Sequence, residues 1–134
     1  INIYINKYQF LIYNSIYMFN KTFNFLVLCL GTRLGLSLLT KNINKKYYKY
    51  ICIFTLIASI GFLSIYTFDL RKEGPEAEGI IWWNKLRPIH GILYLLFTIY
   101  AYKKENFAWI ILLVDTCLGL LFWYLRYYQN MMFI

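Results

Sequence analysis

Four long apolar segments constrain the fold of this chain more than any other feature. A helix needs about 20 mainly apolar residues to cross a lipid bilayer, and its backbone polar groups must be satisfied within the segment. We therefore expect an all-α fold: an integral membrane bundle of about four transmembrane helices within residues 22–134. The four segments cover residues 23–39, 50–68, 88–102 and 107–125.

The third segment, PIHGILYLLFTIYAY, is short for a membrane span. The preceding residues IIWWNKLR could lengthen its helix, but Pro88 would then kink it. Alternatively, Pro88 lies in the first helical turn, where its missing N–H has no consequence. Trp82, Trp83 and Lys85 would then be interfacial anchors, because these residue types favour the headgroup level. The sequence leaves both arrangements open.

Composition supports a membrane protein. Of the 134 residues, 60% are hydrophobic, 22% aromatic and only 15% charged. This is not the composition of a soluble domain of that size. The formal net charge is +8, but the Lys and Arg residues cluster between the apolar segments, where they attract lipid phosphates. We expect membrane lipid as a partner, and we do not expect nucleic-acid binding.

The first 21 residues carry too many polar side chains to span a bilayer. On a helical wheel, Asn and Lys lie mostly on one side and apolar residues on the other. We therefore interpret residues 1–21 as an amphipathic helix in the membrane plane, separate from the transmembrane domain of residues 22–134. A disordered or partner-bound arm is the alternative. The apolar side contains Tyr4, Ile5, Tyr8, Leu11, Ile12, Met18 and Phe19.

Arg33 and Asp115 interrupt the first and fourth segments, and an unpaired charge in lipid costs several kcal/mol. At 1.5 Å per residue, Arg33 lies roughly 10 Å and Asp115 roughly 13 Å from the side where the first two helices connect. We therefore expect a buried charge pair between these residues that joins the first and fourth helices. We interpret the pair chiefly as a structural link between helices, with proton or ion movement as the alternative.

His90 is an alternative partner of Asp115, since it lies about one turn from the same depth. Arg87, His90 and Tyr94 follow helical spacing and share one face with Gly91. We expect a polar cluster there. A single histidine in this position is more often structural than a ligand, and paired-histidine haem binding would need a second His, which this chain does not contain.

Small residues mark the expected sites of helix packing. Gly31 and Gly35 have the spacing that permits close approach of two helices, and they flank Arg33. Packing there would shield the charge from lipid. Gly119, one turn after Asp115, is a comparable site.

No motif in the spans supports catalysis. We find no nucleophile–base arrangement, no paired carboxylates, no phosphate-binding glycine loop and no metal-ligand cluster. The three cysteines, Cys29, Cys52 and Cys117, are far apart and lie inside apolar segments. We therefore expect no enzyme, no cofactor, no metal site and no disulfide framework.

The connections give little information on orientation. Six lysines and one acid lie on the side of the first and third connections, and seven cations lie on the other side. This balance only slightly favours placing both termini away from the positive interior. The longest connection, DLRKEGPEAEGIIWWNK, is the acidic and glycine-rich one, and it is the best candidate for contact with a partner.

The segment from residue 82 to 128 resembles a small uncharacterised family of multi-span membrane proteins from large DNA viruses. The family pattern has a Trp-rich start, L-R-P-x-H, L-Y-L-L-F and a later helix with a central Asp before a Gly-Leu pair. The resemblance covers about a third of the chain and implies no known activity. The matching positions are Leu86, Arg87, Pro88, His90, Leu93 to Phe97, Asp115, Gly119 and Leu120.

We expect a non-enzymatic membrane protein. In this interpretation it is a structural or accessory subunit whose helices pack on partner subunits or on copies of itself. The membrane would be that of a virus or its host, or of an organelle such as the mitochondrion, whose AT-rich genome could encode a respiratory or ATP-synthase accessory subunit of similar composition. The alternative is a small oligomeric ion or proton channel, or a transporter, that uses Arg33, His90 and Asp115.

Overall fold

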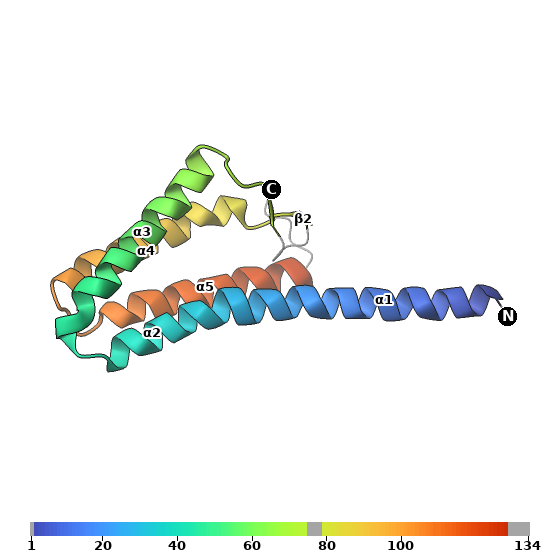
Figure 1. Cartoon of the computed structure of the whole chain (residues 1–134), viewed down its shortest axis with the longest axis horizontal. Helices are drawn as coiled ribbons and strands as arrows, with labels where there is room; N and C mark the ends of the chain where they lie inside the picture. The colour runs from blue at the N-terminus through green and yellow to red at the C-terminus, as the bar shows by residue number, and fades with distance from the viewer. Residues whose placement is uncertain (1, 75–78, 129–134) are drawn as a thin grey trace.

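The computed structural model describes residues 2–74 and 79–128, apart from the side chains of residues 2–7, 17–21 and 79. The predicted all-α fold is confirmed, with one two-residue β pair in a connection (Figure 1). Some predicted features lie outside this description. They are residues 75–78 of the connection expected to contact a partner, including Glu76 and Glu78, residues 129–134, and several side chains of the helical wheel, including Tyr4 and Met18. The elements are α1 (Asn2–Asn24), η1 (Phe25–Gly31), α2 (Thr32–Asn42), η2 (Lys45–Tyr47), α3 (Tyr48–Thr67), β1 (Glu73–Gly74), β2 (Gly79–Ile80), η3 (Asn84–Leu86), α4 (Arg87–Tyr102) and α5 (Ala108–Tyr128).

Three stretches of helix in the described part of the chain are long and apolar enough to cross a membrane: Thr22–Asn42, Lys45–Thr67 and Ala108–Tyr128. They correspond to the first, second and fourth predicted spans. The third, α4, has 16 residues and is roughly 24 Å long, which is short for a bilayer core. Its helix begins at Arg87 with Pro88 in the first turn, so Trp82 and Trp83 do not extend it and Pro88 does not kink it.

The N-terminal helix continues directly into the first span. Asn24 and Thr32 both have right-handed helical backbone angles, and no break separates residues 21 and 22 (Figure 1). The helix therefore runs across the boundary predicted at residues 21 and 22, and the position of residues 2–21 relative to a membrane stays a prediction. Between α1 and α2, the seven residues of η1 form a π-helix. The buried positions in this part of the chain are Phe25, Leu30, Arg33, Ser37 and Thr40.

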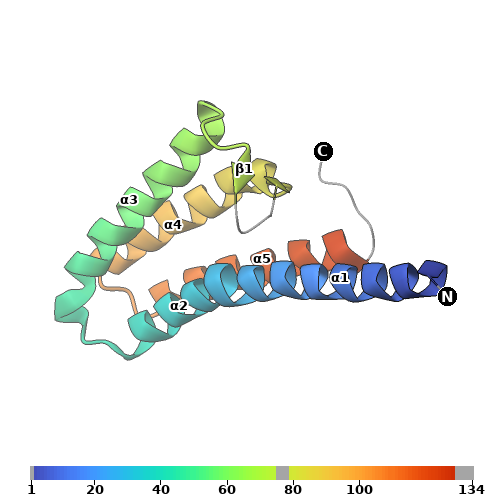
Figure 2. The same ribbon diagram turned by 45° about the vertical axis from the view of Figure 1, so that its right-hand side comes forward.

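The helices form two arms that are joined at one end. In both views α3 lies beside α4, and α2 lies beside α5, while α4 also contacts α5 (Figures 1 and 2). The short connections from α2 to α3 and from α4 to α5 lie at the same end, and the arms separate towards the other end. Lys104, in the α4–α5 turn, has φ 61°, which is a left-handed turn conformation.

The long connection from α3 to α4 lies at the open end of the arms. Glu73 and Gly74 pair with Ile80 and Gly79 in an antiparallel β pair. Before it, Lys72 Nζ lies 2.7 Å from Asp69 Oδ2, and this hydrogen bond raises the pKa of the lysine. The connection therefore has local order in the described residues that flank positions 75–78.

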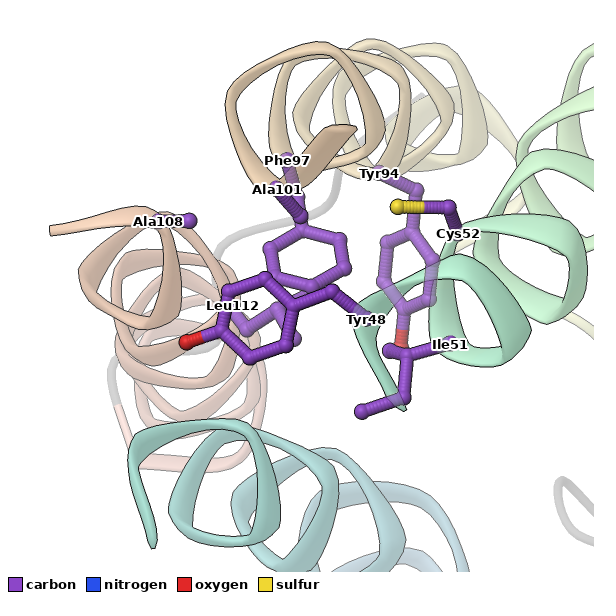
Figure 3. Close-up of a cluster of buried hydrophobic side chains, with 8 residues drawn as sticks. All are labelled: Tyr48, Ile51, Cys52, Tyr94, Phe97, Ala101, Ala108 and Leu112. Carbon is purple, nitrogen blue, oxygen red and sulfur yellow. The ribbon is translucent and has the colours of Figure 1, made fainter. Parts of the chain in front are cut away.

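Two apolar clusters hold the helices together. At the joined end, side chains of α3, α4 and α5 pack around the fully buried ring of Phe97 (Figure 3). At the open end, Phe25 and Leu30 pack with Trp123. The joined-end cluster consists of Tyr48, Ile51, Cys52, Tyr94, Phe97, Ala101, Ala108 and Leu112.

Polar side chains are enriched inside the bundle, and large apolar side chains cover its outside. Five of the seven largest fully buried side chains are polar, whereas Phe54 and Ile57 are 60% and 65% exposed. In a water-soluble protein, polar side chains form a smaller share of the fully buried ones. Such a surface fits lipid, which solvates apolar side chains and leaves polar ones to pair inside. The five polar residues are Ser37, Thr40, Thr55, Ser59 and Asp115.

Hydroxyl groups connect neighbouring helices. Ser59 donates a hydrogen bond of 2.7 Å to the Gly91 carbonyl, which joins α3 to α4. Ser37 donates to the Trp109 carbonyl at 3.1 Å, which joins α2 to α5. In lipid, each bond of this kind contributes about 0.6 kcal/mol on average.

Close helix approach depends on Gly91 and Gly119. A Cβ at Gly91 would lie 2.9 Å from Leu63 Cγ, and a Cβ at Gly119 would lie 2.8 Å from Leu30 Cδ2. The expectation for Gly31 and Gly35 differs from the structure. Both are exposed, and a Cβ at Gly35 would meet no atom within 4 Å. The face that shields Arg33 is therefore the one next to Gly119.

We predict that Gly91→Ala destabilises the bundle and that Gly35→Ala does not. The new methyl at position 91 would clash with the Leu63 branch point, and overpacking of this kind costs about 1–3 kcal/mol. At position 35 the methyl has open space, and alanine favours a helix by about 1 kcal/mol over glycine. Loss of helical circular dichroism during denaturant titration in detergent measures both variants. Equal midpoints for the two variants would contradict the assigned packing.

Candidate functional site

Arg33, His90 and Asp115 meet in the interior of the bundle. Each comes from a different helix: Arg33 from α2, His90 from α4 and Asp115 from α5. Their chain separation is large, so only helix packing brings them together. Gly119 leaves room for the guanidinium, because a Cβ there would lie 3.8 Å from Arg33 Nη1.

The three side chains contact one another directly. Arg33 Nη1 lies 3.0 Å from Asp115 Oδ2 and 2.8 Å from His90 Nδ1. His90 Nδ1 lies 2.5 Å from Asp115 Oδ1. The expected pair of Arg33 with Asp115 is thus present in the structure, and His90, the alternative partner of Asp115, belongs to the same cluster.

The position of one proton decides how the cluster is bonded. If Nδ1 of His90 carries the proton, it donates to Asp115 Oδ1 while Arg33 donates to Oδ2, and both carboxylate oxygens are satisfied. If Nδ1 is bare, it accepts from Arg33, and its short contact with Asp115 needs a protonated carboxyl group. We assign the first form, because it keeps an ion pair of opposite charges and a neutral imidazole. In this form the 2.8 Å approach of Arg33 Nη1 to His90 Nδ1 is a contact between two donors, not a hydrogen bond.

The cluster is almost completely shielded. Asp115 is 0% exposed, His90 4% and Arg33 9%. A carboxylate in this environment is stable only when it is paired and hydrogen-bonded, because desolvation costs several kcal/mol per ion. In the assigned form the cluster has no net charge, so it satisfies this condition.

The remaining helix of the bundle, α3, contributes an aromatic ring to the surroundings of the cluster. Phe62 on α3 lies against the cluster, with the Arg33 guanidinium carbon 5.5 Å from its ring centroid and the His90 ring 6.3 Å away. Phe62 also packs edge-on against Tyr94 at 5.6 Å. No sequence signal identifies Phe62, since an aromatic residue in an apolar helix has many possible neighbours.

The surroundings of the cluster are asymmetric. Towards the open end, Arg33 and His90 border a cavity of about 10 Å³, roughly the space of one water molecule. Arg33 also lines a larger cleft of about 450 Å³ that includes Phe62, Arg71 and Arg87. Towards the joined end, Phe97 and Leu112 are fully buried in the apolar cluster (Figure 3). Leu112 lies about one turn before Asp115 on α5, so this cluster begins directly on that side of Asp115.

Two members of the predicted polar face have other neighbours. Arg87 is buried but extends into the α3–α4 connection, where Nη1 donates to the Arg71 carbonyl at 2.9 Å and to Asn84 Oδ1 at 2.5 Å. Tyr94 belongs to the apolar cluster at the joined end. The spacing of Arg87, His90 and Tyr94 predicted their common face correctly but not these separate roles.

Trp82 and Trp83 pack between elements of the chain. Their rings are 5.2 Å apart, and each also lies within 6 Å of the Phe25 ring. Both side chains are half-buried, whereas Lys85 is exposed. The expected role as lipid-facing anchors was therefore incomplete for the two tryptophans, since they also cover the open end of the cluster. Their level in a membrane stays a prediction.

The described residues contain no group of three His, Cys, Asp or Glu side chains that could hold a metal ion. The cysteines are free thiols, with Cys29 half-buried, Cys52 buried and Cys117 exposed. The cluster itself consists of one guanidinium, one imidazole and one carboxylate within hydrogen-bonding distance of one another.

Comparison of the chain with models of protein families, with curated proteins and with solved structures finds no match. The resemblance to a viral membrane protein family therefore stays an expectation from the sequence. The interpretation of the cluster depends on its geometry alone.

We predict strong coupling between Arg33 and Asp115. Asp115→Asn leaves a buried guanidinium without its counter-charge, and breaking a buried pair in this way costs about 3–5 kcal/mol. The double variant Arg33→Gln/Asp115→Asn removes both charges and loses less stability than the sum of the two single variants. Unfolding midpoints in detergent give the coupling energy.

Thr116→Val is the matched control for Asp115→Asn. Thr116 is the neighbour of Asp115 on α5, and its hydroxyl bonds within its own helix to the Leu112 carbonyl. We expect a loss of less than about 1.5 kcal/mol. Additive effects of the two charge substitutions, or an equal loss in Thr116→Val, would refute a structural ion pair.

Proposed function

We propose that this chain is a non-enzymatic integral membrane protein, a structural or accessory subunit of a membrane complex. In this proposal α4 is the fourth transmembrane helix, so that the helices form an antiparallel four-helix bundle. Support comes from the polar interior, the apolar outer surface and the three helices that are long enough to span. The Arg33–His90–Asp115 cluster then locks α2, α4 and α5 together.

The observation that carries the accessory role is the exposed N-terminal helix. Its described side chains at positions 8–13, 15 and 16 are exposed or nearly so on all sides, including Leu11, Ile12 and Ile16. If Thr22–Asn42 spans the bilayer, a straight continuation carries residues 2–21 roughly 30 Å beyond it. Apolar side chains in water are unfavourable, so a partner subunit best explains this helix.

Lipid is the competing environment for the same helix. It would have to bend near residues 17–24 to lie in the membrane plane, and the continuous backbone of α1, η1 and α2 favours the straight form. The partner in this proposal is another membrane subunit or a second copy of the chain. With either partner, the exposed side chains of the N-terminal helix form the contact surface.

We predict that Leu11→Gln/Ile12→Gln/Ile16→Gln prevents association with partner chains. The tagged chain, purified from its native membrane in mild detergent, retains those chains, and the triple variant loses most of them while its unfolding midpoint stays unchanged. Mass spectrometry and size-exclusion chromatography identify what is retained. The matched control is Tyr47→Gln/Tyr50→Gln/Phe107→Gln, which changes three exposed aromatic residues at the joined end and should retain the partner chains. A lone monomer in the unmodified preparation would refute the accessory role.

A second candidate function is a proton conduit, and one observation favours it. The cleft of about 450 Å³ reaches Arg33 from the open end, and Arg33 contacts both His90 and Asp115. The apolar cluster around Phe97 and Leu112 opposes this function, because it blocks the other half of any path through the chain. Conduction would need that cluster to open.

We expect no proton flux through the reconstituted chain. Liposomes that contain a pH-sensitive dye should acidify at the rate of protein-free liposomes, both for the unmodified chain and for Asp115→Asn. A protonophore added at the end verifies the pH gradient. Flux that is abolished in Asp115→Asn and retained in Thr116→Val would establish the conduit instead.

A further inference from the structure

Lysine side chains gather at the joined end of the bundle. Both short connections lie there, so residues that are about 60 positions apart in sequence share one face (Figure 1). Glu105 is the only acid in residues 40–49 and 103–107. This end therefore has a strong positive charge. The lysines are Lys41, Lys45, Lys46, Lys49, Lys103 and Lys104.

Four of these lysines line one pocket of about 150 Å³, together with Tyr48, Ala101 and Tyr102. The lysines are Lys45, Lys46, Lys49 and Lys104. Lys45 Nζ donates a hydrogen bond of 2.8 Å to the Lys104 carbonyl and so ties the two connections together. The ammonium groups of Lys46 and Lys49 each lie 4.8 Å from the ring of the following tyrosine. The long side chains of Lys46 and Lys49 can turn their ammonium groups from these rings into the pocket, where they would meet an anion with several acceptor oxygens.

An apolar groove begins beside the lysine pocket. It has a volume of about 470 Å³ and is lined by Cys52, Ile53, Leu56, Thr98 and Ile99, with Lys49, Tyr102 and Lys103 at one end. Lys49 and Tyr102 line both spaces, so the groove and the pocket adjoin. From Lys49 to Leu56 the groove follows α3 for about 10 Å.

The polar groups in the groove wall are bonded within the protein. The hydroxyl groups of Thr98 and Thr55 are 2.8 Å apart, and the Thr98 hydroxyl also bonds to the Tyr94 carbonyl. Cys52 Sγ contacts the Thr98 carbonyl at 3.7 Å. The groove therefore presents mainly apolar atoms to a ligand, and its chemistry suits a hydrocarbon chain.

We propose that this end of the bundle binds one anionic phospholipid, with its phosphate among the four lysines and an acyl chain in the groove between α3 and α4. Charge complementarity selects the headgroup, and the adjoining groove selects a lipid over a free phosphate or a nucleic acid. The inference depends on the proposed placement of the chain in a membrane. If the chain proves soluble without detergent, that placement fails, whatever the outcome of the lipid titrations.

The test is native mass spectrometry of the purified full chain in detergent, titrated with dioleoyl phosphatidylglycerol or with dioleoyl phosphatidylcholine. We expect retention of one phosphatidylglycerol with at least tenfold higher affinity than phosphatidylcholine. Lys46→Gln/Lys49→Gln should weaken phosphatidylglycerol binding by about tenfold or more, since each lysine near an anionic lipid contributes separately. The matched control, Lys72→Gln/Lys85→Gln, makes the same charge change at the open end and should bind normally.

Two further measurements distinguish the contribution of the lipid headgroup from that of the acyl chain. Leu56→Trp narrows the groove without changing the charge, so it should weaken the dioleoyl lipid and leave dihexanoyl phosphatidylglycerol unaffected. Inorganic phosphate should compete only at far higher concentration. Equal binding of the two dioleoyl lipids, an equal loss in the open-end control, or equal competition by phosphate would overturn the proposal. A helical circular dichroism spectrum identical to that of the unmodified chain qualifies each variant for these comparisons.

Discussion

This structure depends on how the charged side chains inside the bundle are paired, because a nonpolar interior solvates a charge far less well than water does. Asp115 is fully buried in the middle of α5, and the nearest compensation is a guanidinium from α2 at 3.0 Å. That contact fixes the rotation of both helices, because a small turn of either would separate the charges. His90 adds α4 to the same arrangement, and the Phe62 ring adds α3. The ion pair and its immediate neighbours therefore come from all four helices of the bundle.

Weaker interactions, namely hydrogen bonds and close packing, hold the rest of the interior together. Apolar contacts give little preference for protein over lipid tails, so helices in a membrane associate through close packing and hydrogen bonds. Here Ser59 reaches the Gly91 carbonyl, and the glycine that accepts this bond also allows Leu63 to approach. Aromatic side chains fill the spaces where the arms diverge, as Phe25 and Trp83 do at the open end.

The apolar helices and the Arg33–Asp115 pair could be predicted because both follow from distances counted along the chain. Segment length predicts spans, and counting residues from a helix end gives depth, which placed Arg33 and Asp115 at similar levels. The sequence predicts less well which way a residue faces around the axis of its helix. Gly31 and Gly35 have the right spacing but face outwards, and Arg87 follows the His90 face but extends into the preceding connection. The continuity of α1 with the first span was missed because polar residues suggested a change of environment, not because of any helix-breaking residue.

The π-helical segment η1 has a consequence for how this chain can vary. Between Phe25 and Leu30 the buried face repeats after five residues, whereas from Leu30 to Arg33 and Ser37 it repeats after three and four. A π turn accommodates one residue more than an α turn, so removal of a single residue here would restore the ordinary repeat. Phe25 would then lie four residues before Leu30 and would stay on the buried face. A one-residue deletion in residues 25–31 should therefore be tolerated better than a one-residue insertion, which would turn the preceding helix by about 100° relative to Arg33.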